Sequence, residues 1–309
     1  MYEWLEKEEE RKVMGDWMRN LVQQKAWVRG DPSFRDKRQK IRTRDVFMRW
    51  YAPNENNIMK IVYWLAKILD TTTARKKSSE TFQAAITHLT GWMVEKIFSF
   101  NVVVTRQELF EFINSIPDDF GITVGKCPCK AYTQEKEGLD GRHKGETEFT
   151  CQLPVETDVQ IGRTARHYVE KVPSFRNIDK QELIKLENKL LDLGVVPCIY
   201  NTCQGETAIC NCSPVSCVPL LANRLFGYNL SCFIRQGKYI AVTNKERCIG
   251  CGECLSLAVC PFEARELIGD VDDRHSDIIS SDRCYGCGIC AEHCKQNAIE
   301  MVLREGGAK

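Results

Sequence analysis

Eight of the 17 cysteines in this 309-residue chain lie near its C-terminal end in a regular pattern. Their spacing is Cys248-x2-Cys251-x2-Cys254-x5-Cys260, followed by Cys284-x2-Cys287-x2-Cys290-x3-Cys294. Three thiolates separated by two residues can bind one face of an iron–sulfur cube, and the fourth then reaches a second cube. A zinc site closes four ligands around one ion, with loops between pairs of cysteines. The pattern therefore favours two iron–sulfur clusters over two zinc sites.

These two cysteine groups belong to an internal repeat: shifted by 36 positions, NKERCIGCGECLSLAVCPFEA aligns with SSDRCYGCGICAEHCKQNA. Such a repeat predicts two similar units related by a pseudo-two-fold axis. From Tyr239 to Val302 the sequence resembles the bacterial-type ferredoxins that carry two [4Fe-4S] clusters. The resemblance implies one cluster on Cys248, Cys251, Cys254 and Cys294, and another on Cys260, Cys284, Cys287 and Cys290.

Two positions depart from the ferredoxin pattern. Five residues separate Cys254 from Cys260, where the family usually has three, and Lys295 follows Cys294, where proline is usual. The lysine places a positive charge beside a ligand of the first cluster. We therefore expect the two clusters to differ in reduction potential.

The other nine cysteines are irregularly spaced between residues 101 and 237. Two Cys-x-Cys pairs, in KCPCK and ICNC, each lie ahead of a segment that we expect to be helical. A helix N-terminus favours negative charge and lowers the pKa of a thiol. A third [4Fe-4S] cluster is therefore predicted on Cys127, Cys129, Cys210 and Cys212, with Cys151 and Cys217 as the next candidates. Zinc, or redox-active thiols without metal, are the alternatives. Cys198 and Cys232 are expected to be small buried residues.

This middle region resembles a class of iron–sulfur proteins of anaerobes in which K-C-P-C and I-C-N-C motifs precede a ferredoxin domain. The two cysteine pairs are also locally similar to the catalytic subunit of ferredoxin:thioredoxin reductase. In that family the cluster lies beside a redox-active disulfide, so this similarity implies chemistry on a disulfide or small substrate.

Composition divides the chain into three regions and predicts an α+β fold. Residues 1–100 hold all six tryptophans and no cysteine, and we expect a helical region that docks on a partner. Residues 101–237 suggest a small α/β domain, and residues 238–309 a ferredoxin-like domain with two [4Fe-4S] clusters. The expected elements are helices at 54–69, 80–100 and 179–193, a strand at 101–105 followed by a helix from Arg106, and a strand at 195–196 that ends at Pro197.

Two of these helices have distinctive features. The helix at 179–193 has Asp179 at its N-cap and Glu182 three residues later, which is a capping-box arrangement, and Gly194 is expected to stop it. The helix at 54–69 is apolar nearly all round, which predicts a buried helix.

The overall charge is balanced, with a formal net charge of +1, so no global field points to nucleic acid or a membrane surface. No stretch is apolar enough to span a membrane, and no secretory signal opens the chain, so we expect a reducing, cytoplasmic location. Residues 11–49 contain 12 Lys or Arg against 4 Asp or Glu, interspersed with aromatic residues. Docking on a partner protein is favoured over a helical cap on the chain's own body, and both are favoured over nucleic-acid binding.

These observations predict an iron–sulfur electron-transfer protein, a ferredoxin-like subunit or dedicated donor of an anaerobic oxidoreductase. One alternative is a reductase that uses the middle cluster and adjacent thiols on a disulfide or small substrate. Another alternative is a redox-sensing regulator.

Overall fold

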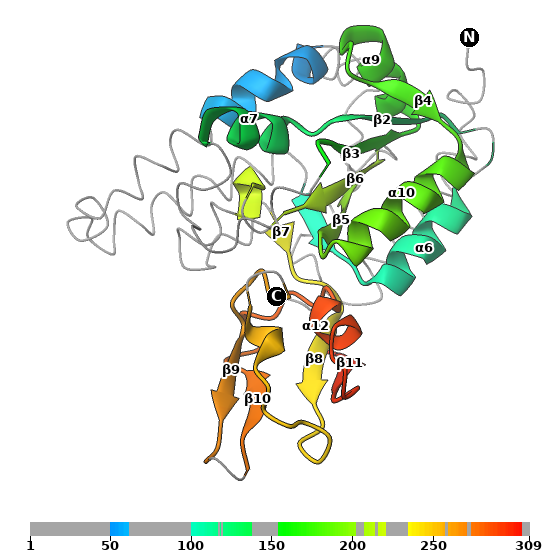
Figure 1. The fold of residues 1–309 in the computed structure, drawn as a ribbon. Helices are drawn as coiled ribbons and strands as arrows, with labels where there is room; N and C mark the ends of the chain where they lie inside the picture. The colour runs from blue at the N-terminus through cyan, green and yellow to red at the C-terminus, as the bar shows by residue number, and fades with distance from the viewer. Residues whose placement is uncertain are drawn as a thin grey trace, which may run out of the picture.

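The computed structural model describes residues 50–61, 100–116, 118, 120–137, 154–201, 207–213, 216–220, 234–256, 259–270 and 273–304. Within them helices and strands are mixed, as predicted (Figure 1). Seven strands form one sheet and four form two small sheets. The change from the large sheet to the small ones falls between Arg235 and Tyr239.

The large sheet has the strand order β4-β2-β3-β6-β5-β1-β7, with all pairs antiparallel except β1 and β7. Its strands are β1 (Phe100–Val103), β2 (Ile122–Lys126), β3 (Glu156–Ile161), β4 (Arg176–Ile178), β5 (Val196–Asn201), β6 (Thr207–Cys212) and β7 (Ile234–Arg235). The cysteine-bearing strands β5 and β6 are therefore interior strands of the sheet.

One face of this sheet carries the main apolar core under α6 (Arg106–Ser115) and α10 (Lys180–Asp192), which lie side by side (Figure 1). Their amphipathic patterns turn one stripe of each helix toward the strands. The core includes Leu109 and Phe112 from α6, Leu183 and Leu191 from α10, and Val124, Val159, Ile199 and Ile209 from the strands.

The opposite face carries the cysteines, because side chains alternate along a strand. Gly125 follows the core residue Val124, and a Cβ on it would lie 2.3 Å from the ring of Phe175. That ring packs with Tyr168 of α9 (Arg163–Lys171) and Ala52 of the helix at 50–61. These two helices and α7 (Pro128–Glu137) therefore cover the cysteine-bearing face.

The C-terminal region consists of two halves that follow the sequence repeat. Its elements are β8 (Tyr239–Thr243), η3 (Glu253–Leu255), β9 (Arg265–Ile268), β10 (His275–Ile278), α12 (Ile289–Glu292) and β11 (Ile299–Leu303). The first strand of one half pairs with the last strand of the other, β8 with β11, and β9 pairs with β10. The two short helices follow left-handed glycines at equivalent positions, Gly252 and Gly288.

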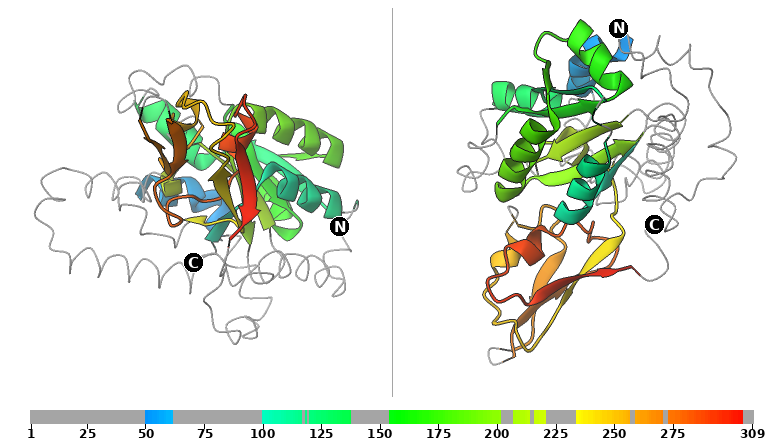
Figure 2. Two further views of the ribbon diagram at one scale, coloured as in Figure 1. Left: turned by 90° about the horizontal axis from the view of Figure 1, so that it is seen from below. Right: turned by 90° about the vertical axis from the view of Figure 1, so that its right-hand side faces the viewer.

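The C-terminal region packs against the end of the large sheet (Figure 2). At the junction Gly237 donates its N–H to the carbonyl of Tyr285 at 2.7 Å, and a Cβ on Gly237 would lie 2.7 Å from the carbonyl oxygen of Val103. The amide of Gln236 donates to the carbonyl of Cys284 at 3.0 Å. The backbones meet so closely that only glycine fits at position 237.

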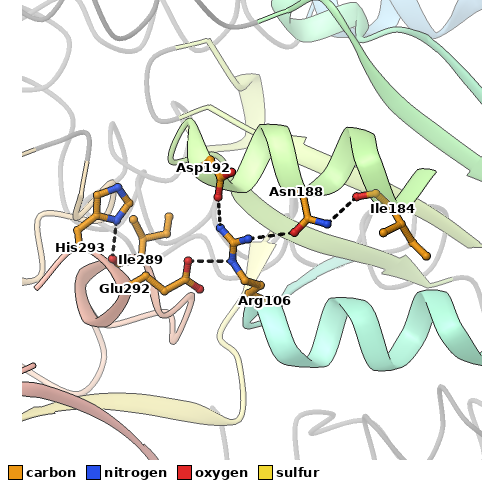
Figure 3. Close-up of polar contacts among 7 residues, drawn as sticks. All are labelled: Arg106, Ile184, Asn188, Asp192, Ile289, Glu292 and His293. Atoms are coloured by element: carbon orange, nitrogen blue, oxygen red, sulfur yellow. Dashed lines mark hydrogen bonds and ion pairs between the residues drawn. The ribbon is translucent and has the colours of Figure 1, made fainter. Parts of the chain in front are cut away.

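Two sets of ionic contacts fasten the same junction. The guanidinium of Arg106 contacts Asn188 at 3.2 Å and Asp192 at 2.7 Å on α10, and Glu292 at 3.0 Å on α12 (Figure 3). A buried pair joins Lys238 to Glu108 at 2.9 Å, with side chains that are 11% and 2% exposed. The ferredoxin-like region is therefore bound to α6 through both exposed and buried charges.

The predicted signals for α10 are confirmed in part. Asp179 accepts a hydrogen bond from the N–H of Glu182 at 2.7 Å, whereas the Glu182 side chain pairs with Arg176 at 2.6 Å instead of closing the capping box. A complete capping box between Thr105 and Glu108 starts α6, and sequence analysis did not identify it.

Two predictions about elements are wrong. The strand at 195–196 does not end at Pro197: β5 continues to Asn201, and the proline carbonyl accepts a bond from the N–H of Val104 at 3.1 Å. The helix at 54–69 is formed in its described part, but residues 54–61 are half-buried or exposed, with Ile61 58% exposed, so this part is not a buried helix. Residues 62–99, with most of the helix expected at 80–100, lie outside the described residues.

Candidate metal centres

Four buried cysteines of the C-terminal region come together from both halves of the repeat, and we refer to Cys260, Cys284, Cys287 and Cys290 as the inner set. Burial, followed by the charge of the Cys290 thiol, raises the pKa of Cys287 well above its usual value, and Cys260 and Cys284 add to this effect. Burial also raises the pKa of Cys290 to about 12. The four thiols are thus close enough to act on one another electrostatically, although Cys260 belongs to the other half.

The remaining four cysteines, Cys248, Cys251, Cys254 and Cys294, form an outer set that is less buried, with Cys251 exposed. Ser276 joins two of them: its N–H donates to the sulfur of Cys248 at 3.4 Å, and its hydroxyl accepts from the thiol of Cys254 at 3.0 Å. An ion pair of 2.8 Å between Lys295 and Glu253 brings the turn that carries Cys294 beside the loop that carries Cys254.

Backbone amides point at sulfur at equivalent places in the two halves. The N–H of Ala264 donates to the sulfur of Cys260 at 3.2 Å, and the N–H of Ala298 donates to that of Cys294 at 3.3 Å. Such bonds stabilise negative charge on thiolate ligands and influence the potential of a bound cluster.

A buried cation lies between the two sets. Arg265 is 5% exposed, and its Nε donates to the hydroxyl of Ser276 at 3.0 Å. Its charge also opposes the rise in the pKa of Cys290. The Nη1 atom is buried and has no hydrogen-bond partner among the described residues. Leaving a buried donor such as this Nη1 without an acceptor costs about 1–3 kcal/mol. The guanidinium therefore fits a site in which the sulfur atoms of a bound cluster accept its hydrogen bond.

The middle cysteines also converge, in a cluster that we refer to as the middle set: Cys127, Cys129, Cys210, Cys212 and Cys217. Thiol hydrogen bonds run from Cys127 to Cys129, from Cys129 to Cys217, and from Cys217 to Cys212. The hydrogen bond with Cys129, followed by burial, raises the pKa of Cys127 well above its usual value. For Cys210 the leading cause of the raised pKa is burial, followed by the charges of Asp158 and Cys127.

Two helix starts face this thiol cluster. The predicted helix after CPC is α7, which begins at Pro128, and the N–H of Lys130 bonds to the sulfur of Cys127. The CNC pair lies in strand β6, so Cys217 rather than this pair directly precedes the helical residues 218–220. The N–H groups of Val218 and Leu220 bond to the sulfurs of Cys129 and Cys217. The second helix start is therefore aimed at Cys217, which sequence analysis ranked behind Cys210 and Cys212.

Buried polar groups beside the middle set escaped sequence analysis because they are scattered along the chain. Lys130 donates to the hydroxyl of Thr157 at 2.7 Å, and Tyr168 donates to Glu55 at 2.5 Å. Burial raises the pKa of Glu55 to about 7. Burial, followed by the charge of Glu55, raises the pKa of Asp158 well above its usual value. A pair of protonatable carboxyls therefore lies near Cys127 and Cys210, and no motif in the sequence indicates it.

Three cysteines, Cys151, Cys203 and Cys232, and the basic segment 11–49 lie outside the described residues. Among the described residues there is no group of three or more Cys, His, Asp or Glu side chains arranged to hold a single metal ion. No described helix is long and apolar enough to cross a membrane.

Comparison with known proteins bears on the C-terminal region. None of the curated proteins compared matches the chain. Residues 240–295, which contain both cysteine triplets, Cys260 and Cys294, match the family model of the 4Fe-4S dicluster domain. The match supports the predicted [4Fe-4S] cofactors and an iron–sulfur electron-transfer role. Residues 240–295 are thus similar to 4Fe-4S dicluster domains, which is consistent with a ferredoxin-like C-terminal region.

Proposed function

We propose that this protein is an electron-transfer protein that serves as a ferredoxin-like subunit or dedicated donor of an oxidoreductase. One [4Fe-4S] cluster is held by the inner set and the other by the outer set. The supporting observation is the position of the Cys260 thiol, which lies with Cys284, Cys287 and Cys290 of the other half. Clusters bound in this way supply one-electron transfer at low potential.

The inner and outer sets differ in how far their surroundings shield them from solvent. The inner set lies in a core with the stacked rings of Phe262 and Tyr285, whose centroids are 4.2 Å apart. In the outer set Cys251 is exposed, and the neighbouring Ile249 is 66% exposed. A partner that exchanges electrons with the chain therefore approaches the outer set.

Anaerobic purification with iron analysis and EPR of the reduced protein tests this function. Two clusters require about eight irons per chain and two reducible centres. Cys251→Ala should remove the signal of one cluster and Cys287→Ala that of the other, while Cys232→Ala serves as the control that keeps both. Retention of both signals in Cys287→Ala would show that the ligand assignment is wrong.

The middle set supports a third [4Fe-4S] cluster. Cys127, Cys129, Cys210 and Cys212 are the predicted ligands, and the contacts of Cys217 with Cys129 and Cys212 make it an equal candidate for the fourth place. A third cluster raises the iron content to about twelve per chain. Zinc at this site would give about eight irons and one zinc, and redox thiols without metal would give eight irons alone.

The carboxyls of the half-buried Glu55 and the buried Asp158 favour a second candidate function, a reductase that works at the middle set. Reduction of a disulfide consumes two electrons and two protons, and Glu55 and Asp158 are protonatable groups near Cys127 and Cys210. A disulfide substrate reduced by the wild-type protein but not by Asp158→Asn, with iron content unchanged, would favour this function over simple electron transfer.

A partner protein is proposed for the N-terminal region. Glu55 accepts from Tyr168, and Lys60 lies 5.7 Å from the ring centroid of Tyr132, so the helix at 50–61 belongs to the body of the protein. A deletion should therefore stop at residue 49. We expect it to leave iron content and viologen-linked electron transfer unchanged and to abolish stable association with the partner oxidoreductase. Loss of the clusters would instead assign residues 1–49 to the chain's own fold.

A further inference from the structure

One continuous buried core contains cysteines of both regions. It joins three cysteines of the middle region, Cys198, Cys212 and Cys217, to the four cysteines of the inner set. Val103, Val196, Ile234 and Tyr285 fill the space around these thiols. Among the residues that the structure describes, no exposed layer separates the two groups of thiols. A soluble electron carrier that only meets its partners at the surface has no need of such a core.

Cys198 lies at the point where the two groups meet. It is fully buried on β5, opposite Val103 of β1 and Cys210 of β6. Its thiol is hydrogen-bonded to that of Cys212, and it lies near enough to Cys287 for the charge of that thiol to act on it. Cys198 therefore lies between Cys212 of the middle set and Cys287 of the inner set, in the same packed core.

The packing of the cysteines orders the three sets. Cys251 of the outer set is exposed, the inner set is buried against the large sheet, and the middle set, in which Cys127 and Cys210 are half-buried, lies on the other side of that core beside α7 and the helix at 50–61. The junction is rigid, because Gly237 and Gln236 are bonded to the backbone of the inner loop and Lys238 is paired with Glu108. Nothing has to move for an electron to pass from one set to the next.

We propose that the middle set is an internal electron acceptor, supplied by the inner cluster across Cys198. This proposal rests on the proposed function, including the third [4Fe-4S] cluster. In the step, one electron passes from the inner cluster, whose core returns from 1+ to 2+, to the middle cluster, whose core goes from 2+ to 1+. No proton or ligand is exchanged. The chain is then a path of three centres, with an external donor at the outer set and delivery of electrons at the middle set.

A matched pair of variants tests this order in the anaerobic holoprotein. In the fully reduced wild type we expect the EPR signal of the middle cluster to be split by its spin–spin interaction with the inner cluster. Cys287→Ala, which removes the inner cluster, should abolish that splitting. Cys251→Ala, which removes the outer cluster, should leave it in place.

The outcomes separate this inference from the proposed function. An iron content near eight with only two electrons accepted per chain would overturn the third centre and leave the two-cluster function standing. Splitting that persists in Cys287→Ala, or vanishes only in Cys251→Ala, would overturn the order. If Cys287→Ala does not fold, the wild type alone still tests the order. An EPR signal of the middle cluster that shows no splitting in the fully reduced wild type would overturn it.

A second inference comes from Arg265, a cation inside the C-terminal region. It opens β9, whereas the residue that opens β11 in the other half is Ile299. The guanidinium donates to the carbonyl and hydroxyl of Ser276, whose own N–H bonds to Cys248 of the outer set. Its charge acts on Cys260 and Cys290 of the inner set. One half of the repeat therefore has a buried charge where the other has an aliphatic side chain.

We infer that Arg265 raises the reduction potentials of the clusters that it separates. Reduction adds negative charge, and a fixed positive charge in a low-dielectric interior stabilises the reduced form. Redox titration followed by EPR measures this directly. Arg265→Met should lower the midpoint potential of at least the inner cluster, and Arg265→Lys should restore most of the loss.

The matched control is Lys295→Met, because Lys295 is a cation beside the outer set whose side chain is 77% exposed. Water screens its charge, so its removal should shift the potentials less than Arg265→Met does. Equal potentials in the wild type and Arg265→Met, with both clusters present, would overturn the inference. If Arg265→Met loses a cluster, Arg265→Gln, which removes the charge but can still donate a hydrogen bond to Ser276, gives the same test: unchanged potentials in that variant would overturn the inference.

Discussion

The inner and outer sets have the same motif and differ in what surrounds it. Each has three cysteines at the same spacing, and a fourth from the other half with an N–H aimed at its sulfur. The inner set is enclosed by the stacked Phe262 and Tyr285 and by the end of the large sheet, whereas Cys251 of the outer set is exposed. The repeat therefore places the two sets of thiols, and the neighbouring region determines which set is sheltered.

The largest effect is expected at a glycine of the inner loop. Gly286 has φ +77, and a Cβ on it would lie 2.2 Å from the carbonyl oxygen of Tyr239. Gly286→Ala should therefore abolish the EPR signal of the inner cluster. Gly288 has φ +84 but its nearest neighbour would be 3.7 Å away, so Gly288→Ala should cost about 1 kcal/mol of strain and keep the cluster. Equal behaviour of the two variants would show that the close backbone contact is unimportant.

Two lysine–glutamate pairs of similar length compare the buried junction with the exposed end. Lys238 and Glu108 are 2.9 Å apart and buried, whereas Lys295 and Glu253 are 2.8 Å apart and exposed. Lys238→Met leaves the Glu108 carboxylate buried without its partner and should lower the free energy of unfolding by about 3 kcal/mol or more. Lys295→Met should leave it unchanged within error, because exposed pairs contribute little. Denaturant unfolding under anaerobic conditions measures the free energy of unfolding of both variants. An equal loss of stability in the two would contradict the expected effect of burial.

The last comparison extends to the middle set and depends on pH. The pKa of Glu55 is raised from 4.5 to about 7, so the folded protein keeps a proton that the unfolded chain has released. Stability should therefore fall as the pH rises from 4.5 to about 7 and be independent of Glu55 above that. Glu55→Gln can still accept from Tyr168 and should flatten this part of the profile. Parallel thermal unfolding curves for the two proteins across this range would contradict the assignment.

The sequence predicted those features that depend on local spacing. The ferredoxin-like region follows from two CxxCxxC triplets and their repeat, and the family match supports it. α10 follows from its end signals, whereas α6 was expected from Arg106 without its capping box. Pro197 was taken as the end of a strand because it lacks an N–H, yet at the second position of β5 its carbonyl still contributes to the sheet.

Features that depend on distant residues could not be predicted. Glu55 and Asp158 are separated by a hundred residues and meet only because the helix at 50–61 covers the sheet face that carries Asp158. Cys198 was expected to be a small buried residue, and it is buried, but its position between Cys212 and Cys287 follows from the docking of two regions. The same docking leaves Arg265 between two cysteine sets, which no spacing along the chain indicates.

The closed junction at Gly237 also constrains the biogenesis of the holoprotein. Once the backbones of Val103, Gly237 and Tyr285 are in contact, the inner thiols are sealed under the sheet, whereas Cys251 still faces solvent. A scaffold that delivers preformed clusters can then reach the outer thiols at any time, but the inner ones only before the two regions close. We therefore expect maturation to have a required order, in which a cluster of the inner set is inserted first and a cluster of the outer set can be replaced later.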